Sequence, residues 1–423
     1  MGSGTLKSID YYIPRIADRP LARHMEAWPA EFITGPRAVG KTTTALRHAR
    51  SVLRLDVKAE RGLVLDDPDA AIRDGPFPLL IDEWQHAPEV LGAVKRAVDA
   101  APRPPCHYLL TGSARNDLHV DQWPLTGRVL TTQLWPLTGR ERFGDAAAPS
   151  LFDRWDSDRR FSLPARRPDI LGYVDIALDG GFPGALAASA AGARDDWMQT
   201  YVDVTVTRDL EEFAAPNGRR RSPESLRRCL HAFALHTSGV VPDTALAQAA
   251  GLDRRTTLSY HEMLTVLLLA ADLPAWHSNR LKRLTSMPKR YLTDSGLAAW
   301  LMGVDRESIL RDSDARGRII DTYVAAQIRA EVSASSGRAH LFHLRTQGGE
   351  HEIDLLVEFG RRVAAFEVKT GNAPNRRGAR HIAWLRDQIP PEQFAGGVVF
   401  HTGPYRYGLG DRIEAVPIAG LWG

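Results

Sequence analysis

One short segment constrains the fold of this chain more than any other: Gly35-Pro36-Arg37-Ala38-Val39-Gly40-Lys41-Thr42 has the G-x-x-x-x-G-K-T spacing of a phosphate-binding loop. The apolar stretch Ala30 to Ile33 before it predicts a strand, and Thr43 to His48 after it predict the beginning of a helix. Gly35 and Gly40 let backbone N–H groups turn toward a phosphate, because no Cβ stands in the way. Lys41 can reach the β- and γ-phosphates and Thr42 can bind Mg²⁺. We therefore predict that Gly35 to Thr43 bind ATP with Mg²⁺; the alternative is a glycine-rich turn without a ligand.

A second segment supplies the acids that such a loop needs. Pro78 to Ile81 form an apolar run, typical of a buried strand in a parallel sheet, and it ends in Asp82 and Glu83. We expect Asp82 to hold Mg²⁺ through water and Glu83 to act as the general base on the attacking water. The run alone is a weak signal, but it gains strength from its position after the phosphate-binding loop.

Three further positions are candidates for the same site. The apolar run Tyr108 to Leu110 ends in Thr111, Gly112 and Ser113, and we expect Thr111 or Ser113 to contact the γ-phosphate or the water. Ordinary turn capping is the alternative for both. Arg37, Arg115 and Arg128 are arginines near the site, and a structural ion pair is the alternative to a catalytic role for all three.

Composition narrows the class of protein. A chain of 423 residues has room for two to four domains, and 43% hydrophobic and 25% charged residues are ordinary for a globular protein. No apolar run approaches the ~20 residues that cross a bilayer, and no signal-peptide pattern begins the chain, so we expect a cytoplasmic protein with no membrane partner. The two cysteines exclude a disulfide framework. A net charge of +3 is too small to indicate nucleic acid, so a DNA partner must rest on local clusters.

The pattern of elements changes along the chain. Residues 1–145 alternate strand-like and helix-like segments, which predicts an α/β domain with a parallel sheet. Asp145 to Pro168 are rich in Ala, Pro, Asp and Arg, which predicts an exposed connector. Two helical stretches, Asp169 to Leu178 and Arg194 to Phe213, then indicate a helical lid over residues 146–215.

Residues 216–304 read as helix, turn, helix, with helices over Pro242 to Ala250 and Thr256 to Leu269. Arg254, Arg255 and Tyr260 lie at the start of the second helix, where a recognition helix meets DNA. A basic wing follows within Trp276 to Tyr291, with the cations Arg280, Lys282, Arg283, Lys289 and Arg290. The pattern predicts a winged helix that contacts DNA; a winged helix that packs on protein is the alternative.

Residues 305–423 carry a second candidate site. Asp354 lies near the start of the predicted strand Ile353 to Phe359, and Glu367 and Lys369 end the next strand, which begins at Val363. Residues two apart on a strand share a face, so Glu367 and Lys369 point the same way. Asp354 can approach Glu367 across the pair, and two carboxylates with a lysine form the D…E-x-K arrangement of metal-dependent nucleases. Solvated charge pairs at strand ends are the alternative.

The whole chain resembles a prokaryotic family of P-loop ATPases that carry a C-terminal restriction-endonuclease-like domain. The segments that carry this resemblance, besides the loop itself, are Tyr12 to Arg15, Leu80 to Gln85, Leu110 to Ala114, Leu125 to Arg128, Phe182 to Gly184, Leu273 to Trp276, Pro288 to Leu297, Ile353-Asp354, Phe366 to Lys369 and Pro417 to Trp422. The resemblance implies an α/β fold class: a parallel-sheet, AAA-type P-loop ATPase core with a helical lid, a winged-helix middle domain and a C-terminal PD-(D/E)XK nuclease-like α/β domain. It also implies a metal role for Asp321, beside Asp354 and Glu367, at a position where the family commonly has Glu. Arg128 matches a family arginine, which implies a γ-phosphate sensor or, if a neighbouring subunit supplies it, an arginine finger.

These inferences predict an ATPase that couples Mg-ATP turnover to a DNA-binding or DNA-cleaving C-terminal module. Two alternatives remain open: a nucleotide-controlled switch or scaffold with an inactive nuclease-like fold, and a DNA-binding regulator that acts through the winged helix.

Overall fold

The computed structural model describes residues 12–100, 106–112, 125–157, 160–190, 192–209, 222–277, 287–346 and 348–423. The chain divides into two compact units: residues 1–135 with 146–148, and residues 136–145 with 149–423. Several positions singled out from the sequence lie outside the described residues, namely Ser113, Arg115, Arg280, Lys282 and Arg283.

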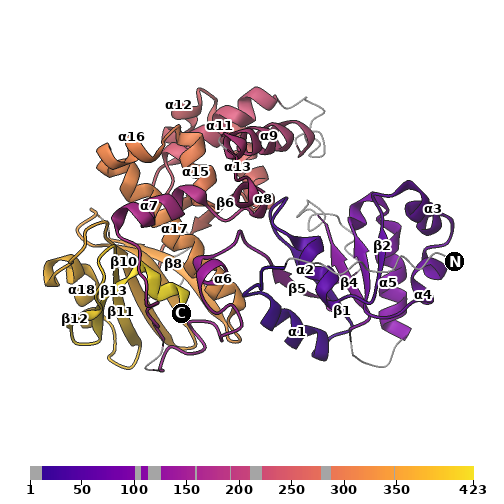
Figure 1. Cartoon of the computed structure of the whole chain (residues 1–423), viewed down its shortest axis with the longest axis horizontal. Coiled ribbons are helices and arrows are strands. Elements are labelled where there is room, and N and C mark those ends of the chain that lie inside the picture. The colour runs from indigo at the N-terminus through magenta and orange to yellow at the C-terminus, as the bar shows by residue number, and fades with distance from the viewer. Residues whose placement is uncertain are drawn as a thin grey trace. The chain divides into compact units, whose positions relative to one another are not determined.

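A five-stranded sheet forms the centre of the first unit, in the order β2-β3-β4-β1-β5, and every neighbouring pair is parallel (Figure 1). This confirms the predicted parallel α/β sheet. β3 and β4 are buried along their whole length, which explains their uninterrupted apolar runs. The strands are β1 (Ala30–Thr34), β2 (Ser51–Arg54), β3 (Leu79–Asp82), β4 (Tyr108–Thr111) and β5 (Leu130–Gln133).

Helices cover both faces of this sheet. Leu21 of α1 and Ala45 of α2 share one apolar cluster with Ile33 of β1. Val64 of α3 and Val90 of α5 share another, on the other face, with Ile81 of β3. The helices are α1 (Asp18–Ala27), α2 (Lys41–His48), α3 (Lys58–Asp66), α4 (Pro68–Arg73) and α5 (Glu89–Ala100).

The second unit contains a six-stranded mixed sheet in the order β12-β13-β11-β10-β9-β8. β10, β11 and β13 run parallel, whereas β8, β9 and β12 pair in antiparallel fashion. Ile328 of α17 packs on one face and Ile382 of α18 on the other. These elements are α17 (Ser313–Ala334), β8 (Ala339–Arg345), β9 (Glu352–Phe359), β10 (Arg362–Val368), α18 (Arg380–Gln388), β11 (Phe394–His401), β12 (Tyr407–Gly410) and β13 (Ile413–Pro417).

The segment expected to be an exposed connector is instead part of this core. Leu151, Phe152, Trp155 and Phe161 are all buried. The Trp155 ring lies 5.8 Å from the ring of Phe366 on β10, and its indole N–H donates to the carbonyl of Ala395 at 3.1 Å. The prediction was wrong because the four large apolar residues are spaced among Pro, Asp and Arg, and no period of 2 or 3.6 marks them as one buried face.

Helices dominate residues 139–311 of the second unit. The expected helix, turn, helix is present: Gly251 ends α12 in the left-handed region with φ 61°, and Asp253 caps α13 through the N–H of Thr256. The antiparallel pair β6–β7 follows. Its assignment as a winged helix stays a prediction. The elements are α6 (Gly139–Phe143), α7 (Ile170–Asp179), α8 (Pro183–Ala187), α9 (Ala193–Val204), α11 (Pro223–Leu235), α12 (Asp243–Ala250), α13 (Arg254–Val266), β6 (Ala270–Leu273), β7 (Lys289–Leu292), α15 (Ser295–Met302) and α16 (Arg306–Arg311).

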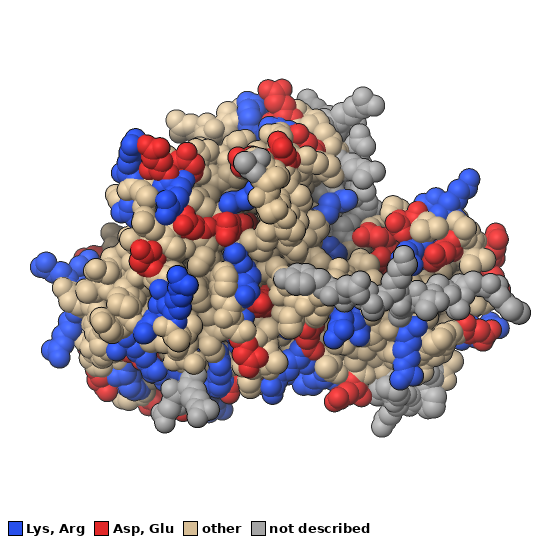
Figure 2. Space-filling model, viewed as in Figure 1, with Lys and Arg blue, Asp and Glu red and all other residues tan. Residues whose placement is uncertain are grey.

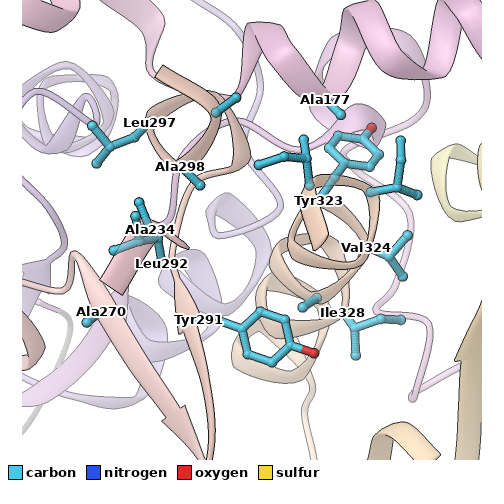
Figure 3. Packing of buried hydrophobic residues seen from close by; sticks show 14 of the residues in the cluster. Ala177, Ala234, Ala270, Tyr291, Leu292, Leu297, Ala298, Tyr323, Val324 and Ile328 are labelled. Atoms are coloured by element: carbon cyan, nitrogen blue, oxygen red, sulfur yellow. The ribbon is translucent and has the colours of Figure 1, made fainter. Parts of the chain in front are cut away.

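One apolar cluster joins β7 to α15 and α17. Its members include Tyr291 and Leu292 of β7, Leu297 of α15 and Val324 of α17 (Figure 3). Within the part of the chain that the structure describes, no helix is both long enough and apolar enough to cross a membrane.

Candidate functional site

The phosphate-binding loop connects β1 to α2 at the carboxyl end of β1. A Cβ on Gly35 would stand 2.3 Å from the carbonyl oxygen of Leu134, so only glycine fits there. Gly40 has φ 97° and caps α2, which again favours glycine. The Lys41 ammonium is buried and donates to the carbonyls of Gly35 at 3.1 Å and Pro36 at 2.8 Å. The lysine therefore lies across the loop on which the phosphates are expected.

Asp82 receives two hydroxyl groups on one carboxylate oxygen. Thr42 donates to Oδ1 at 2.8 Å, and Thr111 donates to the same atom. Burial raises the pKa of Asp82, and the hydrogen bonds from Thr111 and Thr42 oppose that rise. Because β3 and β4 are parallel, their carboxyl ends bring Asp82 and Thr111 to the same edge of the sheet. A hydroxyl beside a carboxylate is the kind of oxygen ligand that Mg²⁺ prefers, so these residues fit the ion.

Glu83 follows in an uncommon backbone conformation. Its φ of 55° lies in the left-handed region, which turns the chain sharply after β3. The amide of Gln85 donates to Oε2 of Glu83, and Gly112 packs so closely that a Cβ there would stand 2.5 Å from Oε1 of Gln85. Gln85 is a candidate site residue that the sequence reasoning did not assign, although it lies within a segment that carries the family resemblance.

Two arginines near the loop have different surroundings. Arg15 is buried and donates to the Val39 carbonyl of the loop at 3.0 Å and to the Trp135 carbonyl. The sequence reasoning gave it no role; its place in a resembling segment was the available signal. Arg128, the candidate sensor, is half-buried and paired with Asp99 at the end of α5, at 2.6 Å.

The second candidate site lies on β9 and β10. The two strands pair antiparallel with Leu355 opposite Phe366, which brings the neighbouring residues Asp354 and Glu367 together as predicted. Oδ2 of Asp354 accepts from the backbone N–H of Val368 at 3.0 Å. The Lys369 ammonium lies 2.9 Å from Oε2 of Glu367. Burial and then the charge of Asp354 raise the pKa of Glu367 to about 8, and its Oε1 has no hydrogen-bond partner among the described residues.

A lysine from β7 completes this cluster. The Lys289 ammonium donates to Oδ2 of Asp321 at 2.8 Å and to Oδ1 of Asp354 at 2.9 Å. Burial raises the pKa of Asp321 to about 6 against the pull of Lys289. Burial by itself would raise the pKa of Asp354. The charges of Lys289 and Lys369 outweigh the effect of burial, so the pKa of Asp354 is lowered. The hydroxyl of Tyr291 donates to Asp321 at 3.2 Å.

Lys289 and Arg290 correct the expectation of a basic, DNA-facing wing. Both side chains are buried, and Arg290 forms ion pairs with Asp243 and, at 3.8 Å, with Asp272. Tyr260, expected on the DNA-facing surface of α13, is also buried, and its hydroxyl binds the backbone of Ser222. Arg255 is exposed, as is Arg254 with 64% of its side chain accessible. Figure 2 shows both charge signs interspersed over the face in view.

A pocket of 470 Å³ gives the second cluster an opening. Its lining includes Lys289, Arg318, Asp321, Arg345, Asp354 and Lys369. Among the residues that the structure describes, no group of three or more Asp, Glu, His or Cys side chains is arranged to hold a metal ion. The predicted ligands Asp321, Asp354 and Glu367 are each bonded to a lysine ammonium instead.

The comparisons with known proteins bear on the first unit most directly. Residues 28–143 match the family model of an AAA domain. Together with the parallel sheet, this match supports an AAA-type P-loop ATPase domain in the first unit. Residues 171–308 and 316–421 match two domains of unknown function, DUF8612 and DUF4143. The restriction-endonuclease-like fold expected for residues 305–423 therefore stays a prediction.

Particular relatives can also be named. Uncharacterized protein Rv2008c of Mycobacterium tuberculosis and uncharacterized protein Mb2031c of Mycobacterium bovis are each 28% identical to this chain over 407 residues. These residues make up 95% of this chain and 83% of each relative. Among solved structures, the Walker-type ATPase PABY2304 of Pyrococcus abyssi is 17% identical with a TM-score of 0.42, over 70% of this chain and 97% of that one.

Proposed function

We propose that this chain hydrolyses ATP with Mg²⁺ at the loop between β1 and α2. The observation that carries the proposal is the pair of hydroxyls, from Thr42 and Thr111, on one oxygen of Asp82, together with the buried Lys41 that precedes Thr42. Three separate elements place these groups at one edge of the sheet. A structural turn has no need of both a buried lysine and a buried carboxylate, because each costs free energy to desolvate.

Each residue has a role that its contacts support. Lys41 exchanges its bonds to the Gly35 and Pro36 carbonyls for bonds to the β- and γ-phosphates. Thr42 and Asp82 hold Mg²⁺, which neutralises charge on the phosphate oxygens. Glu83 takes a proton from the attacking water, and Gln85 orients the Glu83 carboxylate. We propose Arg128 as a γ-phosphate sensor or, across a subunit contact, an arginine finger; either role requires it to leave Asp99.

Two variants test this proposal. Lys41→Ala removes the cation that reaches the phosphates, so ATP binding should be lost. Glu83→Gln keeps the shape but cannot take a proton, so binding should persist while turnover falls by at least ~10². Fluorescent-nucleotide titration and phosphate release measure the two properties. Lys58→Ala, on an exposed lysine of α3, is the matched control and should change neither. Turnover of Glu83→Gln at the wild-type rate would show that another group is the base.

A second function is favoured by Asp354 and Glu367. They lie on neighbouring strands with Lys369 bonded to Glu367 at 2.9 Å, as in the D…E-x-K arrangement predicted for metal-dependent nucleases. We propose that the second unit is a nuclease-like module that binds DNA and cleaves it when Mg²⁺ or Mn²⁺ is bound. The three carboxylates are suitable ligands, and the unpartnered Oε1 of Glu367 fits a cation, whereas the ammonium of Lys289 opposes one.

Incubation with plasmid and single-stranded DNA tests this second function, with Mn²⁺ or Mg²⁺ and with or without ATP. Cleavage that Glu367→Gln and Lys369→Met both abolish, with ATP turnover intact, would support it. DNA binding without cleavage would favour the scaffold or regulator alternatives, in which the fold binds but does not cut.

A further inference from the structure

Lys289 lies among the carboxylates of the second candidate site. Its ammonium bridges Asp321 of α17 and Asp354 of β9 at 2.8 and 2.9 Å. Glu367 of β10 lies beside Asp354, so the lysine bridges two members of a group of three carboxylates that come from three elements. Only 1% of Lys289 is accessible to solvent. It therefore differs from exposed surface lysines, whose ion pairs contribute little to stability.

The ammonium is held charged by its surroundings. Burial alone would lower the pKa of Lys289, but the carboxylates of Asp321 and Asp354 raise it well above its ordinary value. In turn, two buried carboxylates without a cation would be costly. Lys289 therefore supplies the positive charge that this pair requires.

The lysine is also fixed by its strand. Lys289 pairs with Leu273 of β6, and two residues later the ring of Tyr291 reaches toward α17, where its hydroxyl donates to Asp321 (Figure 3). Leu292, next along β7, is fully buried in the same apolar cluster. The apolar packing of β7 thus fixes the backbone position from which Lys289 extends, independently of the charges that its ammonium meets.

We propose that Lys289 and a divalent cation are alternative occupants of the Asp321, Asp354 and Glu367 site. A metal shared by these carboxylates would sit ~2.0–2.6 Å from their oxygens, which leaves no room for an ammonium bridging the same pair. The pocket of 470 Å³, lined by Lys289, Asp321 and Asp354, gives a cation its route to the site. This inference rests on the second proposed function in one respect, the assignment of Asp321, Asp354 and Glu367 as metal ligands, and it does not require DNA cleavage.

Mn²⁺ binding without ATP tests the inference, measured by the electron paramagnetic resonance of the free ion. Lys289→Met removes the ammonium and keeps most of the side-chain volume. We expect it to bind Mn²⁺ at least tenfold more tightly than the wild type. The double variant with Asp354→Asn should lose that gain, which assigns the bound ion to this site. Arg345→Met is the matched control, because it removes a cation that lines the same pocket but pairs with Glu352 rather than with the three carboxylates of the site.

Melting temperature establishes that each variant is folded, and ATP turnover, which depends on the other unit, shows that the first unit is unaffected. If Lys289→Met does not fold, Lys289→Gln replaces it and keeps a hydrogen-bond donor for the two carboxylates. Equal Mn²⁺ affinity in the wild type and a folded Lys289 variant would overturn the inference. So would an anomalous peak for Mn²⁺ beside Asp354 in wild-type crystals with Lys289 unmoved. Absence of DNA cleavage by the wild type and every variant would contradict the proposed nuclease function but not the inference about Lys289.

Discussion

The hydroxyl of Thr42 and the carboxylate of Asp82 are hydrogen bonded at 2.8 Å, although 40 positions separate them in the chain. Thr111 reaches the same oxygen from a third element. The carboxylate therefore has two donors that compensate its burial, and each is a single hydroxyl that a substitution can remove without altering the backbone.

Thr111→Val is expected to weaken the response to Mg²⁺. It removes one donor from a buried carboxylate at nearly constant volume, a loss of about 1 kcal/mol in the arrangement that holds the ion. The Mg²⁺ concentration for half-maximal ATP turnover should rise roughly fivefold. Thr132→Val is the matched control, since that buried hydroxyl binds Glu31 on β1 instead. An unchanged Mg²⁺ requirement in Thr111→Val would mean that Thr111 only caps its strand.

Arg15→Met is expected to impair nucleotide binding although Arg15 is not part of an ATP-binding sequence motif. The guanidinium supports the Val39 carbonyl within the loop, so its loss leaves the loop less ordered before ATP arrives. We expect the KM for ATP to rise about tenfold with kcat changed less. Arg19→Met, at an exposed position on α1, controls for loss of charge nearby. A normal KM in the Arg15 variant would assign the residue to stability alone.

Glu367 gives a pH dependence with a defined sign. Its pKa is raised from the ordinary 4.5 to about 8, so the folded state holds the proton more tightly than the unfolded state does. The corresponding stability is fully present below pH 4.5 and is lost as pH rises through about 8. Glu367→Gln mimics the protonated form at every pH. Its melting temperature relative to the wild type should therefore increase across this window and level off above it.

A chelator is present in these thermal unfolding measurements so that no bound metal ion contributes to the melting temperature. Glu392→Gln reports the effect of losing an exposed carboxylate elsewhere in the same unit. A constant difference between Glu367→Gln and the wild type from pH 5 to 9 would contradict the assignment.

The exposed pair Arg254 and Arg255 tests the DNA-binding alternative. Each phosphate contact contributes about one unit to the slope of log K against log salt, so replacing both with Ala should flatten that slope by about two. Arg306 and Arg311 on α16, replaced in the same way, control for total charge. If the slope for duplex DNA does not change, the helix, turn, helix packs on protein.

More of the first candidate site than of the second could be predicted from residues that are close together in the sequence. The loop from Gly35 to Thr43 and the acids after β3 are each encoded within a few residues, and a parallel sheet must bring such strand ends together. Asp354 and Glu367 were also predictable, because a hairpin fixes their register. Lys289 was not: in Lys289-Arg290-Tyr291 a local pattern indicates an exposed basic strand, and only contacts with Asp321 and Asp354 make burial favourable. Arg15 was missed for the same reason, since its partners are distant backbone carbonyls. Gln85 was missed although its partner Glu83 is only two residues away.

Trp155 carries a consequence for how such chains can be recombined. Its ring fills space between Phe359 and Phe366, so the C-terminal sheet is completed by a stretch that precedes it by about two hundred positions. A fragment that begins at Asp305 would leave that space open, at a cost of ~3–5 kcal/mol for the missing indole alone. A chimaera in which relatives exchange C-terminal segments should therefore fold only when residues 149–161 are exchanged as well. Two stretches that lie far apart in the gene must then be inherited together.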